Sequence, residues 1–364
     1  MGYRYLLMSD NMKLNSRIIG IGYARQMMSS VVSALSLSLI IIALSAPPAS
    51  SQNVDAGTVA FPFLVMGYDA RSMAMGGAAC AVQNGLYGVL SNPAAVGYVN
   101  NTQVMGGYRQ VMMDVWGYPI GIAMPTRYGA FAPYLVSLTS GEFNVIDEDG
   151  FVTGDRARSS YTALGVGWAK TVSANIAVGA ALKGAYHYIG AGEEKYSADG
   201  FALDIGAQYR QRNDRIAYGV ALRNLGFMRS GYWGEWNEYE MPYGVEAGVA
   251  FVPKHIPNLR IAFDANKFNG DYANFEPAFE YTVVSKIFWV RGGYAFSIMD
   301  VDKMLDVFRG ERDETYQKSS VNTLSVGVGL AAVVDNVDLK LDAAMQFYTD
   351  ISSPAVIVSL LVGF

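Results

Sequence analysis

The segment from Ala355 to Phe364 alternates strictly between two faces, and it constrains the fold more than any other feature of the chain. One face of the expected strand carries Val356, Val358, Leu360, Val362 and Phe364, and the other carries Ile357, Ser359, Leu361 and Gly363. An open sheet that ended in such a strand would expose an unprotected edge. A closed barrel in lipid has no edge, because its last strand pairs with its first. The segment therefore favours a transmembrane β-barrel.

The same alternation recurs along the chain from about residue 101. Fourteen expected strands begin near residues 101, 113, 128, 159, 175, 198, 215, 241, 258, 272, 286, 319, 337 and 354. Their connections alternate between two kinds. The short ones are Pro125–Arg127, Ser173–Ala174, Asn213–Asp214, Pro253–Pro257, Val284–Ser285 and Asp335–Asn336, and the others, most of them longer and polar, are 141–158, 190–197, 227–240, 298–318 and 350–353. This asymmetry is typical of outer-membrane barrels, in which turns face the periplasm and loops face outward.

Charged residues share one face of these strands. An Arg or Lys that faces lipid at the bilayer midplane costs about 2–4 kcal/mol, so the apolar face must point outward. The charged residues that would then line the lumen are Asp204, Arg223, Asp264, Glu280, Arg291, Lys340 and Asp342. Their mixed signs indicate pairing across the interior. They would hold an internal plug in place or, alternatively, bind a substrate.

Composition agrees with a barrel in lipid. Charged residues make up only 16% of the chain, which has 24 Tyr and 39 Gly. A soluble β-sandwich or propeller is the alternative, and it would normally carry more charge on its surface. The net charge of −5 gives no reason to expect a nucleic-acid partner. The single cysteine, Cys80, excludes an internal disulfide and a cysteine-rich metal site.

Enzymatic chemistry is not expected. The only two histidines are His187, near the loop end of a strand, and His255, in a short turn. They would lie a membrane thickness apart, so they could not share a site for acid–base catalysis. The Gly-x-Gly fragments Gly165–Gly167 and Gly327–Gly329 lie in strands rather than before helices, so they predict no nucleotide site. No metal or other cofactor is expected.

The first hundred residues differ from the rest. Val31–Leu44 is apolar and uncharged, basic residues precede it and small residues follow it, so residues 1–51 read as a signal peptide. A transmembrane anchor is the alternative, although the run is short for a span of about 20 residues. Residues 52–100 lack strand periodicity and would form a partly helical hatch in the lumen, with Asn92 capping a helix that begins at Pro93. Residues 101–364 would form the barrel.

Several motifs in this order resemble the PorV/PorQ family. They are Ala70–Ala78 (ARSMAMGGA), Asn92–Ala94 (NPA), Leu222–Gly226 (LRNLG) and Val290–Tyr294 (VRGGY). The resemblance implies a barrel like that of the fatty-acid transporters (FadL-like), with fourteen strands and an amino-terminal hatch. By similarity the hatch residues are Arg71, Gly76, Gly77, Asn92, Pro93 and Ala94. The terminal Phe364 resembles the assembly signal of bacterial outer-membrane barrels.

The resemblance also implies a function. The best-known members act without catalysis in type IX secretion, where they bind the translocon, or capture secreted cargo and help attach it to the cell surface. Loops 141–158 and 298–318 would then face the partner. The alternative is uptake of a hydrophobic small molecule, as in the fatty-acid transporters. The aromatic run Gly231–Trp236 could form an apolar mouth for such a ligand, or it could belong to the aromatic girdle at the membrane surface. In either case the outer-membrane lipid is an expected partner.

Overall fold

The computed structural model describes residues 59–112, 114–146, 151–191, 194–232, 239–271, 273–297, 322–348 and 353–364. The expected signal peptide, the 298–318 loop and Trp233–Trp236 lie outside the described residues. Among the described residues no helix is both long and apolar enough to cross a membrane.

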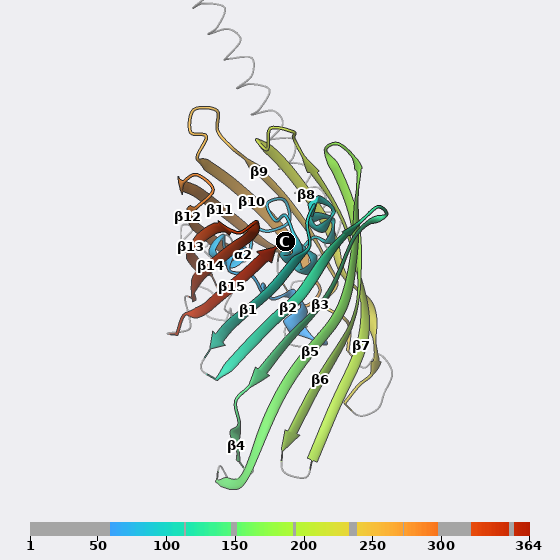
Figure 1. Cartoon of the computed structure of the whole chain (residues 1–364). Helices are drawn as coiled ribbons and strands as arrows, with labels where there is room; N and C mark the ends of the chain where they lie inside the picture. Colours follow the sequence, from blue (N-terminus) through green and yellow to red (C-terminus); the bar gives the residue numbers. More distant parts are fainter. Residues whose placement is uncertain are drawn as a thin grey trace, which may run out of the picture.

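Fourteen antiparallel strands close into a barrel (Figure 1), as the alternation predicts. The ring consists of β1 (Gln103–Met112), β2 (Val115–Thr126), β3 (Gly129–Ser140), β5 (Val152–Ser173), β6 (Ile176–Ala191), β7 (Glu194–Arg210), β8 (Ile216–Ser230), β9 (Gly244–Phe251), β10 (Leu259–Phe268), β11 (Ala273–Val284), β12 (Phe288–Ser297), β13 (Thr323–Val334), β14 (Val337–Tyr348) and β15 (Ala355–Gly363). The seam forms where β1 pairs with β15, from Gln103–Gly363 to Gln110–Val356.

The expectation of a loop at 141–158 was wrong. β4 (Phe143–Ile146) and the first part of β5 form a hairpin there, and β5 to β7 extend beyond the other strands (Figure 1). The sequence hides this extension because both faces carry polar residues, for example Asp155 and Arg156. Apolar alternation marks only the part of a strand that has lipid on one side, and this part lies beyond it.

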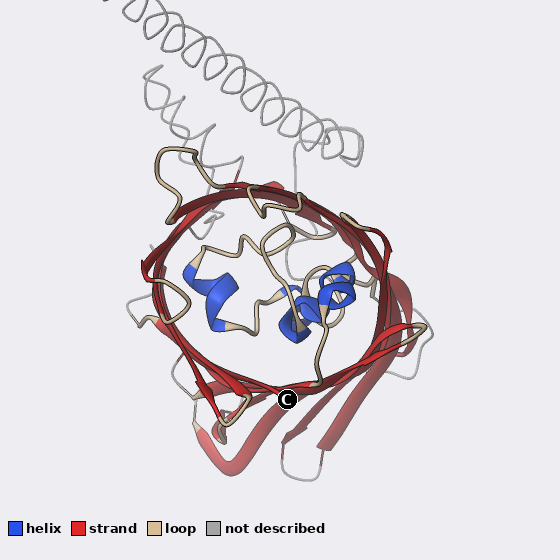
Figure 2. Ribbon diagram, turned by 45° about the horizontal axis from the view of Figure 1, so that its top comes forward, coloured by secondary structure: helices blue, strands red, loops and turns tan. Residues whose placement is uncertain are grey.

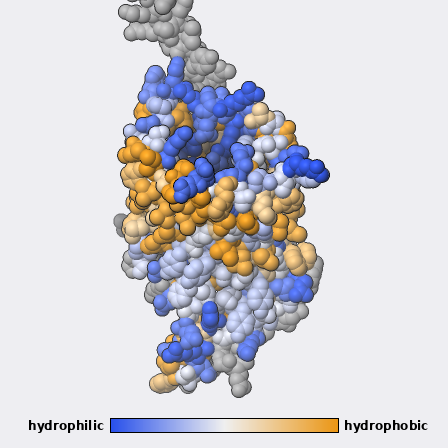
Figure 3. Space-filling model, in the orientation of Figure 1, coloured by the Kyte–Doolittle hydropathy of each residue, from blue (hydrophilic) through white to orange (hydrophobic). Residues whose placement is uncertain are grey.

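The outward face of the barrel forms an apolar belt. Figure 3 shows hydrophobic residues gathered across the middle of one face, with hydrophilic residues at both ends. Large apolar side chains are exposed on neighbouring strands, including Ile120, Leu164, Leu182, Ile205, Leu324 and Leu360. Such a surface requires an apolar solvent, so the barrel is a membrane protein.

Short turns join the strands at one end, here called the turn end, and longer connections join them at the loop end. In the turn between β13 and β14, Asp335 and Asn336 both adopt positive φ, at 49° and 67°. This is the geometry of a type I′ turn, whose twist matches that of the flanking strands. Asp and Asn tolerate it better than most residues do.

The described residues before β1, 59–100, lie inside the ring (Figure 2) and are here called the hatch. They form three 3₁₀ helices, η1 (Pro62–Val65), η2 (Leu86–Leu90) and η3 (Pro93–Tyr98), and the short helix α2 (Ala70–Ala74). The side chain of Asp69 accepts a hydrogen bond from the Ser72 amide at the start of α2. The side chain of Asn92 caps η3 by accepting from the Ala94 amide.

Candidate functional site in the barrel lumen

A chain of ion pairs joins the hatch to the barrel wall. Arg71 of the hatch donates two hydrogen bonds to Glu280 of β11, from Nε to Oε2 and from Nη2 to Oε1, each 2.9 Å long. Glu280 also accepts from Arg291 of β12 at 2.8 Å, and Arg291 reaches Asp342 of β14 at 2.5 Å. Arg260 lies 3.7 Å from Glu280. These five residues are called the tether network.

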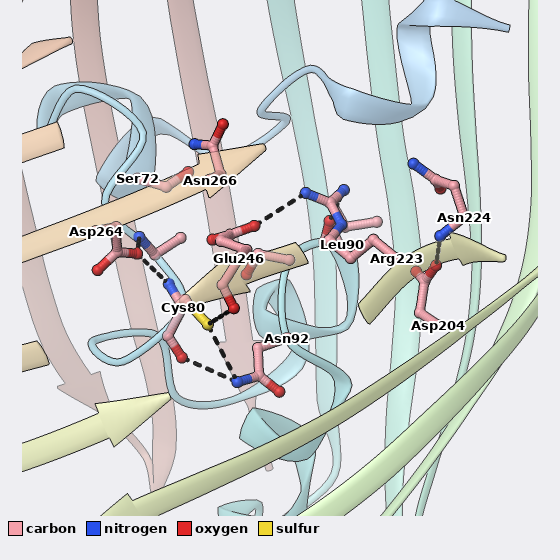
Figure 4. A network of polar contacts seen from close by, with 12 residues as sticks. Ser72, Cys80, Leu90, Asn92, Asp204, Arg223, Asn224, Glu246, Asp264 and Asn266 are labelled. Carbon is pink, nitrogen blue, oxygen red and sulfur yellow. Dashed lines mark hydrogen bonds and ion pairs between the residues drawn. The ribbon is translucent and has the colours of Figure 1, made fainter. Parts of the chain in front are cut away.

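Further polar contacts hold the hatch from β7 to β10 (Figure 4). Arg223 pairs with Glu246 at 3.3 Å and donates to the carbonyl oxygens of Leu64 and Leu90. One oxygen of Asp264 accepts from the amides of Ala79 and Cys80, at 2.8 and 2.7 Å. Hatch backbone groups that have no helical partner thus find partners on the wall, as buried backbone groups must.

The seven charged residues singled out in the sequence occupy different surroundings in the lumen. Glu280, Arg291 and Asp342 lie together in the tether network, whereas Arg223 and Asp264 contact other parts of the hatch. Asp204 pairs with Lys183 at 2.7 Å and accepts from the Asn224 amide, so it acts within the wall. Lys340 lines a cavity that is described below.

Sequence reasoning missed two wall partners in this set, Lys183 and Glu246. The period of two could have revealed both. Lys183 shares a face with the small residues Ala181 and Ala185, and Glu246 shares one with Gly244 and Gly248, as expected of positions that face the lumen.

The six hatch residues named by similarity lie at points of close packing. Gly76 has a φ of +69°, and a Cβ there would come within 2.9 Å of the Tyr294 backbone nitrogen. Gly77 has a φ of +111°, and a Cβ there would meet the Glu276 carboxylate at 2.5 Å. Nδ2 of Asn92 donates to the carbonyl oxygens of Cys80 and Ala207, both at 3.1 Å.

Pro93 and Ala94 press against β6. A Cβ at Gly179 would lie 2.7 Å from the Pro93 carbonyl carbon and 2.8 Å from the Ala94 nitrogen. Small residues at this point of the wall therefore allow the hatch backbone to approach.

Cavities lie at several places between the hatch and the wall. A crevice of about 20 Å³, lined mainly by apolar side chains and here called the apolar crevice, lies between Phe63 and Leu64 of the hatch and Tyr134, Val136 and Ala163 of the wall. Lys183 and Arg223 also line it. A polar cavity of about 100 Å³ lies toward the loop end, and a larger polar cavity of about 180 Å³ lies toward the turn end. Asp69 and Tyr87 line both polar cavities, so they separate the two.

Burial changes the titration of two hatch groups. It raises the pKa of the Asp69 carboxyl above its ordinary value, against hydrogen bonds from Ser72 and Gln83 that lower it. It also raises the pKa of the Cys80 thiol, and the nearby charges of Glu246 and Asp264 act in the same direction. Cys80 therefore stays a thiol, as expected of a buried cysteine that packs as a small apolar residue.

The two histidines lie at opposite ends of the barrel. His187 of β6 contacts the Ser159 hydroxyl through Nε2 at 2.8 Å and stacks on the Tyr161 ring at 3.7 Å. His255 lies in the short turn between β9 and β10. The described residues contain no group of three potential metal ligands.

Comparison with known proteins identifies the fold alone. No family model matches the sequence, and no curated protein matches it. Among solved structures, the toluene transporter TodX of Pseudomonas putida shares 13% identity at a TM-score of 0.56, over 82% of this chain and 97% of its own. The monoaromatic hydrocarbon channel CymD shares 12% identity at a TM-score of 0.58, over 84% of this chain and 98% of its own. The chain therefore shares the fold of these two channels.

Proposed function

We propose that this barrel admits small hydrophobic molecules across the bacterial outer membrane and is not an enzyme. The likeness to two hydrocarbon channels supports the proposal, since it extends over nearly their whole length. The observation that carries it is the apolar crevice, where Phe63 and Leu64 of the hatch meet Tyr134, Val136 and Ala163 of the wall. Two cations, Lys183 and Arg223, also line the crevice, but they already pair with Asp204 and Glu246 of the wall. A hydrocarbon that displaces the apolar contacts therefore leaves both charges paired.

The crevice is small at rest. Its volume of about 20 Å³ holds no aromatic ring, whereas an apolar cavity of about 150 Å³ binds benzene. Side chains of the hatch must therefore move to admit a ligand. Met66 also lines the crevice, and an unbranched thioether side chain repacks more readily than a branched one.

The experiment fills or empties the crevice. Ala163→Phe should block it, and the rate of labelled toluene uptake by bacteria that carry the barrel in their outer membrane should fall to that of cells without it. Phe63→Ala should enlarge it and strengthen toluene binding by the purified barrel about tenfold, roughly 1.4 kcal/mol. Ala180→Phe, on the lipid face of β6, is the matched control. Equal uptake by the Ala163→Phe and Ala180→Phe barrels would refute the proposal.

Protein binding in secretion is the second candidate. The sheet formed by β4 and the extended parts of β5 to β7 projects beyond the ends of the other strands (Figure 1). Near its tip, Phe143, Ile146, Phe151 and Val152 are 47–70% exposed. Exposed apolar residues at such a place are typical of a protein-binding surface. Together with the motifs that resemble PorV/PorQ, they support a role in binding a translocon or cargo.

A pull-down distinguishes the two candidates. The tagged barrel should recover a secretion component or a secreted protein, and replacement of residues 141–158 by a short turn should abolish recovery without affecting toluene uptake. A barrel that recovers no such protein, with or without the hairpin, would eliminate the second candidate.

A further inference from the structure

A polar cavity of about 180 Å³ in the lumen lies beside the short turns. Trp289 is the second residue of β12, Arg260 the second of β10 and Lys340 the fourth of β14, and all three line it. The side chains of Arg260 and Asp342 remain 20% and 17% exposed, so water reaches the cavity. It is thus open to solutes at the turn end.

Positive charge predominates in this cavity. Its lining holds four cations, Arg71, Arg260, Arg291 and Lys340, and three carboxylates, Asp69, Glu280 and Asp342. The carboxylate of Asp69 already accepts from the Ser72 amide, the Ser72 hydroxyl and Gln83. Asp214 also pairs with Arg260, but its side chain is 54% exposed at the rim. Within the cavity, four cations therefore face three carboxylates, and only Glu280 and Asp342 form ion pairs with them.

The tether network accounts for three of these cations but not for the fourth. Arg71, Arg260 and Arg291 all face Glu280. Lys340 lies on the lumen side of β14, two residues from Asp342, and forms no ion pair within 4 Å among the described residues. Its ammonium group, with three donors, is therefore free to bind an anion that enters the cavity.

The rest of the lining suits an organic anion. Trp289, Tyr87 and Leu361 contribute two aromatic rings and an aliphatic side chain beside the cations. The volume exceeds the roughly 150 Å³ that accommodates benzene. Guanidinium groups bind carboxylates through paired, charge-assisted hydrogen bonds, which a neutral ring cannot accept.

We propose that the turn-end cavity binds a small aromatic carboxylate, with its carboxylate between Lys340 and Arg260 and its ring against Trp289. This site differs from the apolar crevice in position, in lining and in ligand charge. This proposal does not depend on hydrocarbon uptake, because the barrel could bind benzoate at the turn end without transporting toluene.

Calorimetric titration of the full-length, detergent-solubilised barrel tests the proposal. Sodium benzoate should bind saturably, and at least about tenfold more tightly than inorganic phosphate, which lacks the ring, or benzyl alcohol, which lacks the charge. Lys340→Gln should weaken benzoate binding about tenfold and leave the urea midpoint of unfolding unchanged, because the tether network does not use this residue. Trp289→Leu should weaken benzoate binding but not phosphate binding.

Lys286→Gln is the matched control. Lys286 lies in the turn between β11 and β12 at the same end, and it does not line the cavity. Its replacement should not alter benzoate binding. Equal losses for Lys340→Gln and Lys286→Gln would attribute binding to surface charge and overturn the proposal. Phosphate or benzyl alcohol that bound as tightly as benzoate would also overturn it, as would the absence of benzoate binding.

Discussion

Two arcs of the lumen wall hold the same hatch in different ways. In the apolar arc (β2, β3 and residues 157–171 of β5), no described lumen-facing residue is charged, and the wall contacts Phe63, Val89 and other apolar hatch residues. In the charged arc (β10 to β14), Asp264, the tether network and hatch backbone groups form directional contacts. Directional contacts fix the position of the hatch, whereas apolar contacts depend on area and volume and tolerate rearrangement. The difference suggests that the hatch moves at the apolar arc first.

Loss of Glu280 should have the largest effect. Glu280→Gln leaves Arg71, Arg260 and Arg291 facing a neutral amide, and removal of one partner from a buried ion pair costs about 3–5 kcal/mol. The hatch should then open far more often. The lone cysteine, Cys80, is fully buried in the hatch, so the rate at which a maleimide labels it in the folded barrel reports opening. We expect labelling to accelerate by about a hundredfold or more.

A surface pair provides the control for this prediction. Glu142 pairs with Arg156 at 2.9 Å, but their side chains are 57% and 68% exposed. Glu142→Gln should therefore leave Cys80 labelling unchanged, since exposed ion pairs contribute little. If Glu280→Gln labelled as slowly as the unmodified protein, the charged arc would not hold the hatch.

A larger residue in β6, where the wall lies next to the apolar arc, should have an intermediate effect on hatch docking. A methyl group at Gly179 collides with the backbone of Pro93, which cannot turn aside as a side chain could. Gly179→Ala should destabilise hatch docking by about 1–3 kcal/mol, measured as faster Cys80 labelling. In the same strand, a Cβ at Gly184 would have its nearest neighbour at 3.6 Å, so Gly184→Ala should be tolerated. Equal labelling of the two variants would show that the hatch does not pack closely here.

Replacement of Asp69 should have the smallest effect on stability, and the size of this effect should depend on pH. Burial raises the pKa of this carboxyl in the folded state above 3.8, so the folded protein holds the proton more tightly than the unfolded chain does. The resulting stability is present below pH 3.8 and is lost as the pH rises toward the folded-state pKa. Asn caps helices as well as Asp does. Asp69→Asn should therefore match the unmodified protein at low pH and exceed it by less than about 1 kcal/mol at neutral pH. Urea unfolding at several pH values measures this, and identical pH profiles would contradict it.

The sequence predicted which residues of the wall face the lumen better than it predicted which of their side chains meet there. A period of two decides which residues face the lumen, so the positions of Arg291 and Asp342 followed from their own strands. Their contact did not, because β13 lies between β12 and β14. The two side chains meet over Gly329, where a Cβ would lie 2.6 Å from Arg291 Nη1 and 2.3 Å from Asp342 Oδ1. The alternation marked Gly329 as a small residue in a strand but could not reveal which side chains cross it.

The pairing of β1 with β15 has a consequence for the order of assembly. This seam joins residues about as far apart as the wall allows, Gln103 with Gly363, so its closure carries the largest loop entropy of any strand pair. The hatch precedes β1 in the chain and bonds to strands from β7 to β15. If the β1–β15 pair is the last to form, these strands can assemble around the hatch while the barrel is still open at one side. No threading of a finished segment through a finished ring is then needed.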